Sequence, residues 1–401
     1  MPGSEDAPFD FPDEDQILAI GYWLLAIGHR PLAIADSPCR CHTFRTLMNM
    51  RTLVWIGIFA LSCGPAFLRG ESVADTPENR EKRTAEAIAE ALAQKYGHAM
   101  PQVAYIPALA LWGRLWLAEI QNKQPARDEV VKLAIAAPEP KEWSGPAVAG
   151  HLIFAAIGDR NRVLKAAALG LDEKGDPRDH LENWGGMSDS VFMDCPLLTA
   201  AGRLTEEDRY FTAAANHLFF LEENLMRKSG IYDHSKKCQA AWGRGNGFPA
   251  LGVALMLTEF PSDHPDRKDL EDSFREHLEA LSKHQDANGM WHQIIDRPES
   301  YPEFTCTCMI AFAMQRGVRL KLLDQKIYQP MVDRAWTAIK RRIHLDGEAV
   351  EGVCPSTGAL ATLEDYLKRP EVNGRDERGG AMALMFALEK LSAEKGLGGE
   401  E

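Results

Sequence analysis

Apolar residues recur at helical spacing along most of the chain, from about Thr76 to the C-terminus. They lie three or four residues apart through long segments, which is the pattern of helices that bury one face. The strict alternation typical of strands is nearly absent, and glycine, proline, aspartate and asparagine gather between the periodic segments. The pattern predicts an all-α fold with helices at 79–95, 108–120, 128–136, 147–157, 160–169, 190–201, 206–226, 247–258, 268–285, 304–315, 322–342 and 376–393.

A weak internal repeat indicates how these helices are arranged. Residues 229–234 (SGIYDH) resemble 288–293 (NGMWHQ), and a more divergent copy occupies 346–350 (DGEAV). The glycines of the three copies are 59 and 58 residues apart (289 − 230 and 347 − 289). Each copy follows a long predicted helix and leads into another. A repeat of two helices and one loop predicts a helical toroid, in which loops distant in sequence converge on one cleft.

The first 74 residues do not continue this pattern. Residues 48–51 (MNMR) are a short basic segment, and 52–68 form an apolar run that is short for a membrane span and broken near its end by Gly64-Pro65. Residues 72–74 (SVA) then place small side chains at the positions that a signal peptidase reads. This order is typical of a secretory signal peptide, and a buried N-terminal helix is the alternative.

The expected organisation follows from that signal. We expect residues 1–47 to be an upstream extension that is disordered or not translated, and 48–74 to be a signal peptide. Residues 75–401 would form a single catalytic domain, because no linker or charge block divides them. The mature protein would be exported, periplasmic or secreted, without a stable membrane anchor after the signal is cleaved.

Charge and cysteine content narrow the classes of function. The net charge of −13 argues against nucleic-acid binding, which needs a basic face. Residues 1–74 hold eight acidic and five basic residues, so the remainder carries −10, and only local groups could attract an acidic substrate. The five cysteines after residue 74 show no disulfide framework, and Cys306 and Cys308 lie in an apolar segment that favours the core over a metal site. The histidines lack metal-ligand spacing, so we expect neither metal nor cofactor.

Polar clusters between the helices carry the candidate chemistry. Asp189 precedes an apolar helix, where it could cap the helix or act as an acid. Residues 242–248 (WGRGNGF) combine glycines that allow close approach, an arginine that can grip a carboxylate, and aromatic rings that stack on sugars. A helix-entry turn with a structural arginine is the alternative. Residues 232–234 (YDH) and 291–303, which begin with Trp291 and His292, complete the set.

Several of these motifs occur together in one known family. Residues 242–247 (WGRGNG) resemble W-A-R-G-N-G, and 288–303 resemble D-G-L-W-x-Q followed by S-Y-x-E. Residues 189–193 match the segment that holds a catalytic aspartate, and 353–358 (VCPSTG) match a C-terminal V-C-x-G-T-G turn. The chain resembles the unsaturated rhamnogalacturonyl and glucuronyl hydrolases of glycoside hydrolase families 88 and 105, strongly over residues 180–390.

The resemblance implies an (α/α)6 barrel, a six-hairpin helical toroid, and an unusual hydrolysis. The substrate would be an acidic oligosaccharide that a polysaccharide lyase has left with a 4,5-unsaturated terminal uronic acid. An acid protonates C4, water adds at C5, and the resulting hemiketal falls apart. The resemblance assigns the acid to Asp189. It leads us to expect substrate contacts from His234, Trp242, Arg244, Asn246, Phe248, Trp291 and His292.

Two positions depart from the family pattern. Phe248 stands where the family usually has tryptophan, and the stretch 143–151 has no aspartate where the family has a second one at a helix start. Alternative functions on the same fold are a sugar epimerase, a polysaccharide lyase or a non-catalytic carbohydrate-binding protein. The expected export signal argues against an epimerase, and the missing aspartate keeps the binding protein open.

Overall fold

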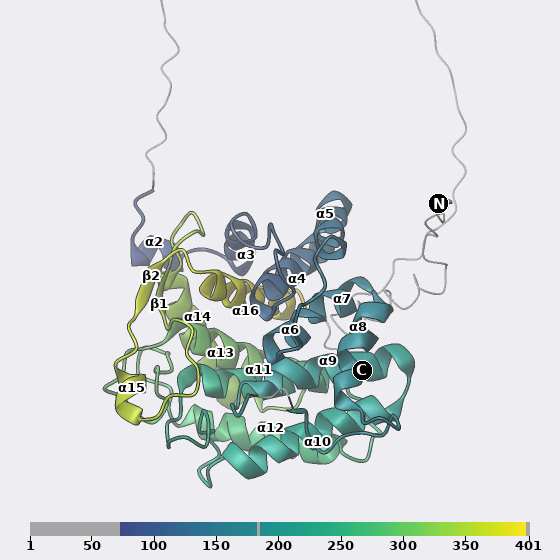
Figure 1. Ribbon diagram of the computed structural model, residues 1–401. Coiled ribbons are helices and arrows are strands. Elements are labelled where there is room, and N and C mark those ends of the chain that lie inside the picture. Colours follow the sequence, from purple (N-terminus) through teal and green to yellow (C-terminus); the bar gives the residue numbers. More distant parts are fainter. Residues whose placement is uncertain (1–72, 183–184, 398–401) are drawn as a thin grey trace, which may run out of the picture.

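The structure, a computed structural model, describes residues 73–182 and 185–397, and almost all of its regular elements are helices (Figure 1). The expected upstream extension and all but the last two residues of the expected signal peptide lie outside the described residues. None of the described helices is long and apolar enough to span a membrane. The helices are α2 (Pro77–Glu81), α3 (Ala85–Ala93), α4 (Tyr105–Ile120), α5 (Gln124–Ile135), α6 (Gly145–Gly150), α7 (Leu152–Ile157), α8 (Arg160–Ala167), the 3-10 turn η1 (Ala168–Gly170), α9 (Ser190–Thr205), α10 (Asp208–Leu225), α11 (Gly243–Glu259), α12 (Arg267–Ser282), α13 (Phe304–Arg319), α14 (Gln325–Arg342), α15 (Leu363–Leu367) and α16 (Glu377–Glu394).

The long helices form two concentric layers. In the inner layer α4, the α6–α7 pair, α9, α11, α13 and α16 each pack against the next, and α16 closes the ring on α4. Helices α3, α5, α8, α10, α12 and α14 pack on the outside of this ring (Figure 1). The strands β1 (Val350–Val353) and β2 (Val372–Gly374) add one small antiparallel pair. The predicted all-α fold and (α/α)6 barrel are therefore confirmed.

The two layers differ in burial because they have different neighbours. Every residue of inner helix α11 from Gly243 to Leu257 is buried, since other helices surround it. Outer helix α12 instead buries one face, on which Leu270, Phe274 and Leu278 recur every four residues. The sequence therefore holds two helical patterns. Outer helices carry apolar residues on one side, and inner helices are apolar along almost their whole length.

Most predicted helices are present with ends shifted by a few residues, and two predictions are corrected. The helix predicted at 79–95 is two helices, α2 and α3, and the helix predicted at 147–157 is α6 and α7, divided at His151. Assignments commonly differ by one or two residues at helix ends. The two divisions lie beyond that range, and they adjust the path of the chain without changing the fold.

The glycine-rich motif is also corrected, because it forms the first turn of α11 where a loop was expected. A Cβ atom added to Gly243 would lie 2.7 Å from the carbonyl oxygen of His292. A Cβ on Gly247 would lie 2.9 Å from the sulfur of Met309. These glycines therefore let α11 approach α13 and the loop before it closely. Their role is close packing, which sequence composition does not distinguish from loop flexibility.

The internal repeat corresponds to a repeated turn. Gly230, Gly289 and Gly347 all have a positive φ, of 83°, 93° and 74°. They follow the outer helices α10, α12 and α14, each at the point where the chain turns back towards the inner layer. Glycine adopts this backbone conformation without the steric cost that other residues have. The repeat is thus a repeated return from outer to inner helix.

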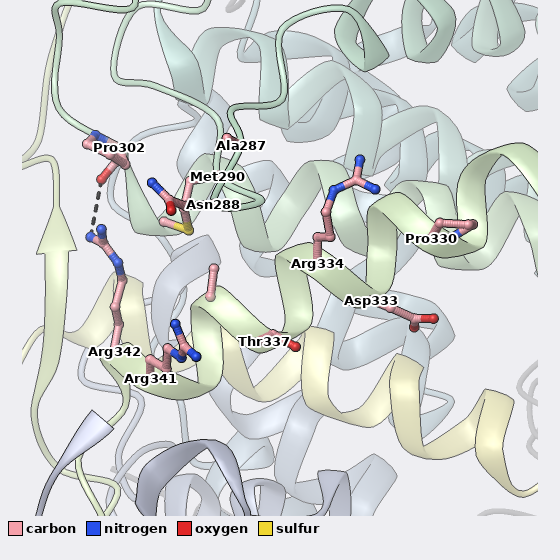
Figure 2. Close-up of a pocket in the computed structure, with 11 residues that line it drawn as sticks. Ala287, Asn288, Met290, Pro302, Pro330, Asp333, Arg334, Thr337, Arg341 and Arg342 are labelled. Carbon is pink, nitrogen blue, oxygen red and sulfur yellow. Dashed lines mark hydrogen bonds between the residues drawn. The ribbon is translucent and has the colours of Figure 1, made fainter. Parts of the chain in front are cut away.

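A groove of about 610 Å³ lies on the outside of the barrel, where α14 faces the turn that follows α12 (Figure 2). The cationic side chains there are already engaged in part: Arg341 pairs with Glu81, and Arg342 donates to the carbonyl of Pro302 at 3.4 Å. The predicted site residues do not line this groove. Its lining residues are Ala287, Asn288, Met290, Pro302, Pro330, Asp333, Arg334, Thr337, Ala338, Arg341 and Arg342.

Candidate active site

The candidate site lies where the first turns of several inner helices meet. Tyr105 begins α4, and burial raises the pKa of its hydroxyl. The charges of Arg244, which lowers that pKa, and of Asp189, which raises it, act on the same hydroxyl from the starts of α11 and α9. Arg244 also reaches Thr305 in the first turn of α13, at 3.3 Å. Helix N-termini carry a partial positive charge, so this end of the barrel suits an anionic ligand.

Asp189 immediately precedes α9, but it does not cap that helix. Its backbone is helical, with φ −52° and ψ −28°, and its side chain makes no capping hydrogen bond. The carboxylate turns instead towards His234, with Oδ1 3.3 Å from Nε2, and its side chain is 14% exposed. The capping interpretation of Asp189 is therefore wrong, and the carboxylate remains available for chemistry.

His234 is fully buried and held on both sides. Its backbone N–H donates to the carbonyl of Ala240, and its own carbonyl accepts from the N–H of Ser188 just before α9. Its ring nitrogen Nδ1 lies 2.7 Å from the hydroxyl of Tyr366. These contacts fix the imidazole so that Nε2 faces Asp189.

Trp242 forms the wall beside this histidine. It stands directly before α11, is 1% exposed, and its ring centroid lies 4.4 Å from that of His234. The guanidinium carbon of Arg244 lies 4.6 Å from the centre of the Trp242 ring. The indole thus contacts both a cation and a tilted imidazole, which favours a fixed orientation.

Arg244 is buried, and its terminal nitrogens bind the protein itself. One nitrogen donates to the carbonyl of Pro355 at 2.7 Å and the other to the carbonyl of Cys354. Burial disfavours the charge, but the neighbouring acidic groups, of which the carboxylate of Glu303 at 3.7 Å contributes most, together outweigh it and raise the pKa of the guanidinium above its ordinary value. The turn at Cys354 and Pro355 thus occupies the arginine fork that was expected to bind a substrate carboxylate.

Several buried polar atoms at this site have no hydrogen-bond partner among the described residues. They are Oδ1 of Asp189, Nε2 of His234, Nε1 of Trp242, Nε of Arg244 and Oε1 of Gln293. Asp189 and His234 are close, but their mutual orientation does not form a hydrogen bond. Buried polar atoms are nearly always partnered in proteins, so a group of them without partners indicates a place for water or a polar ligand.

Four residues expected to contact substrate are held by the protein itself. The amide of Asn246 is bonded to the backbone of Tyr232 and Trp242, and Nε1 of Trp291 donates to the carbonyl of Leu281 at 2.8 Å. His292 contacts the carbonyl of Ser300 through one ring nitrogen and Asp286 through the other. Phe248 is buried against Phe192 and Tyr105. These contacts support the site from within, and contact of the four residues with substrate stays a prediction.

Two residues at the site were missed by sequence reasoning. Gln293 donates through Nε2 to the carbonyl of Tyr366 at 2.8 Å, which leaves its Oε1 without a partner among the described residues. Tyr366 itself bonds His234. Gln293 lies within the recognised W-x-Q motif and could have been chosen from it, whereas Tyr366 lies on the short helix α15 with no sequence signal. Within the described ranges no group of three His, Cys, Asp or Glu side chains is placed to hold a metal ion.

Comparison with known proteins gives this site a family. Residues 178–393 match the model of Glycosyl Hydrolase Family 88, which is more than half of the chain. The chain belongs to glycosyl hydrolase family 88. It is 29% identical over 220 residues to the unsaturated rhamnogalacturonyl hydrolase YesR of Bacillus subtilis, covering 52% of this chain and 61% of that protein. It is 29% identical over 177 residues to an unsaturated 3S-rhamnoglycuronyl hydrolase of Formosa agariphila, covering 40% of this chain and 47% of that protein.

Solved structures similar to this family 88 chain show the same fold. A possible member of family GH105 from Salmonella enterica aligns with a TM-score of 0.67 at 19% identity, covering 84% of this chain and all of that one. The unsaturated glucuronyl hydrolase from Bacillus sp. GL1 aligns with a TM-score of 0.54 at 17% identity, covering 80% and 98%. At these identities the likeness establishes the helical toroid, and the chemistry must come from the residues of this chain.

The expected departure from the family 88 pattern has a defined place in the fold. Helix α6 begins at Gly145, and a Cβ atom there would lie 3.1 Å from Cβ of Met193 on α9. The start of α6 therefore packs beside α9, the helix that follows Asp189. The residue at its start is Ser144, and residues 143–151 contain no aspartate or glutamate.

Proposed function

We propose that this family 88 chain is a glycoside hydrolase that removes a terminal 4,5-unsaturated uronic acid from lyase-generated acidic oligosaccharides. The observation that carries the proposal is the group of unpartnered buried polar atoms around Asp189, His234 and Trp242. Two curated relatives, which this chain matches over about half of their length, are named for hydrolysis of unsaturated glycuronyl compounds.

The proposed reaction needs one group that gives a proton and later takes one. Protonated Asp189 donates its proton to C4, which breaks the C4=C5 double bond and leaves an oxocarbenium ion at C5. Water adds at C5 and gives a proton back to the Asp189 carboxylate. The resulting hemiketal opens by breaking the C5–O5 bond, so the ring becomes an open-chain keto sugar. The anomeric carbon is then a hemiacetal that releases the shortened saccharide, and the two-carboxylate scheme of ordinary glycosidases is not required.

The neighbouring groups fit this reaction as donors. Nε1 of Trp242 is an N–H that points from a buried ring without a described partner, and it can donate to an oxygen of the uronate. His234 offers a second nitrogen beside Asp189. Arg244 contributes a buried positive charge that the carboxylate of Glu303 offsets in part. The site is therefore built to orient an anion through several hydrogen bonds rather than one arginine fork.

Ultraviolet absorbance of the unsaturated uronide tests the proposal. Purified protein is incubated with oligosaccharides made by a polysaccharide lyase, and the absorbance of the conjugated double bond is followed. The proposed hydrolase makes it fall. A rise on intact polysaccharide would identify a lyase, and an unchanged signal would identify an epimerase or a non-catalytic carbohydrate-binding protein. A panel of galacturonyl and glucuronyl disaccharides then determines the substrate class.

We further propose that the protein is exported and that its signal peptide is cleaved after Ala74. The basic, apolar and small-residue order of residues 48–74 supports this, and the charge of −10 on the remainder is compatible with an exported enzyme. The N-terminal sequence of protein recovered from the periplasm or medium should begin at Asp75. Recovery of protein that still carries residues 1–47 would refute cleavage at this site.

A further inference from the structure

Tyr366 lies behind the proposed site and is completely buried. It belongs to α15, which lies on the long connection between α14 and α16. Its ring packs in a small apolar cluster with Trp242, Ile294 and Cys354. The side chain therefore has a fixed position, and its hydroxyl reaches the imidazole of His234 from the side opposite Asp189.

The hydrogen bonds of Tyr366 decide which way its proton points. Burial raises the pKa of Tyr366 to about 12, although the N–H of Leu360 donates to its oxygen and works against that rise. The hydroxyl is thus protonated at any working pH. The Leu360 N–H, 3.1 Å from the oxygen, and the side chain of Ser235 both hydrogen-bond the tyrosine oxygen and lower its pKa, so they occupy its lone pairs as donors, and His234 Nδ1 lies 2.7 Å away. If Nδ1 also donated, the oxygen would have to accept three times and its own proton would lose this partner.

We propose that Tyr366 is a positioning residue that donates to Nδ1 of His234 and so keeps the histidine proton on Nε2, facing Asp189. This inference rests on the proposed function for its consequence in turnover, but not for the tautomer itself. The tautomer follows from the two donors to the tyrosine oxygen, Leu360 and Ser235, and from the buried position of the tyrosine and histidine rings.

The position of this proton determines whether Asp189 can act as an acid. An imidazole nitrogen with a free lone pair is a stronger base than a carboxylate. If Nε2 of His234 carried the lone pair, a small reorientation of either side chain would let it take a proton from Asp189, whose Oδ1 lies 3.3 Å away. With a proton already on Nε2, that nitrogen cannot accept another, so transfer to His234 does not compete with transfer to C4. Tyr366 thereby acts on the reaction through His234 without touching the substrate.

Nitrogen NMR of histidine-labelled wild-type protein tests the tautomer directly. The His234 signals are assigned by their loss in His234→Ala. We expect Nε2 to be the protonated nitrogen in the wild type, and Tyr366→Phe to move protonation towards Nδ1. A wild-type spectrum with the proton on Nδ1 would overturn the proposal, and this measurement does not require the variant to fold or the enzyme to be active.

Kinetics test the consequence. Tyr366→Phe should lower kcat at least roughly 10-fold and leave KM within about 2-fold, because the tyrosine does not bind substrate. The matched control is Tyr301→Phe. Tyr301 packs against the same apolar cluster, but its hydroxyl bonds the carbonyl of Pro370, so this variant should leave kcat unchanged.

In a His234→Ala background, Tyr366→Phe should have no further effect on kcat. Independent, multiplying effects would show that Tyr366 does not act through His234. A wild type that leaves the unsaturated uronide unchanged would refute the proposed function alone.

Discussion

At the scale of single residues, the site depends on a side chain that does not make the hydrogen bond expected from its position. Asp189 stands where an aspartate normally caps a helix, yet it makes no cap bond and turns to His234. Its carboxylate therefore makes none of the backbone hydrogen bonds of a helix cap. Asp189 thus stands at the start of α9, but its carboxylate does not cap that helix.

Substitution of Asp189 by asparagine tests this design. Asparagine is nearly isosteric but cannot donate a proton of suitable acidity. Because no cap bond is lost, the free energy of unfolding should stay within about 1 kcal/mol of the wild type while turnover falls at least roughly 100-fold. Urea unfolding and the absorbance assay measure the two quantities. An Asp189→Asn protein that unfolds early yet turns over normally would mean that the acid lies elsewhere.

Gly245 offers a second residue-scale test. A Cβ atom there would lie 3.0 Å from the hydroxyl of Ser188 and 3.2 Å from Cδ2 of His234. Gly245→Ala should therefore shift His234 by a few tenths of an ångström and lower kcat several-fold, since a small misplacement of a reacting group is costly. Gly358→Ala is the matched control, because a Cβ atom there meets nothing within 4 Å. Equal activity in both variants would show that the His234 position is tolerant.

How far the sequence predicts the site is also decided at this scale. Asp189, His234 and Trp242 were predicted, and they lie together. Asn246 and Trp291 belong to equally distinctive motifs, but their polar atoms are bonded to backbone groups inside the protein. A motif contains both the residues that bind substrate and the residues that hold them in place, so the sequence alone does not separate the two kinds. Side-chain direction depends on contacts between segments far apart in the chain.

At the scale of elements, the sequence predicted which segments form helices, but it did not predict which other segments each helix contacts. Periodicity placed the helices because a packed helix must bury a face. The start of α11 was misplaced because a glycine-rich segment has the composition of a loop. Its glycines instead accommodate neighbours such as the His292 carbonyl, 2.7 Å from a Cβ atom on Gly243. That neighbour comes from a segment about 50 residues away, which no local pattern reveals.

The contact between α13 and α16 supports a prediction about pH. Glu389 on α16 is fully buried and accepts from Arg316 at 2.6 Å and Arg319 at 2.9 Å. Burial alone would raise the pKa of Glu389, but the two arginines dominate and lower it to about 2. Because the pKa is lower in the folded state than its ordinary 4.5, the pair stabilises the fold fully above about pH 4.5. This stabilisation is lost as the pH falls towards 2.

Glu389→Gln removes this charge and should lower the free energy of unfolding at pH 7 by roughly 3–5 kcal/mol, since two buried arginines lose their partner. The difference from wild type should shrink as the pH falls from about 4.5 towards 2. Glu279→Gln, which removes an exposed carboxylate paired with Lys283, is the control and should cost less than about 1 kcal/mol. A Glu389→Gln deficit that is constant with pH would assign the loss to packing rather than charge.

At the scale of the whole molecule, the N-terminal end of the described chain is bound to α14 and to the segment that follows it. Asp75 accepts from Arg80 at 2.6 Å and from the backbone N–H of Leu345 at 3.2 Å. Arg80 is 5% exposed and also donates to Glu351 of β1 at 2.7 Å. Arg83 donates to the carbonyl of His344 at 3.0 Å, just beyond α14. The fold therefore makes structural use of the chain from Asp75 onward.

Two truncations test whether Asp75 is where the folded protein begins. Of the hydrogen bonds among the described residues, deletion of residues 1–74 removes those to the Ala74 carbonyl, so we expect the melting temperature to stay within about 2 °C of the full chain. Deletion of residues 1–83 also removes α2 with Arg80 and Arg83, leaving Glu351 and the carbonyl of His344 without these donors. We expect the melting temperature to fall by at least roughly 4 °C, because charged hydrogen bonds to partly buried groups are lost.

Calorimetry of the full chain and the two truncated proteins distinguishes the outcomes. If the protein without residues 1–74 melted as early as the shorter one, residues before Asp75 would belong to the fold and cleavage after Ala74 would be refuted. If both truncated proteins melted with the full chain, α2 would contribute nothing and the boundary of the domain would lie beyond Arg83.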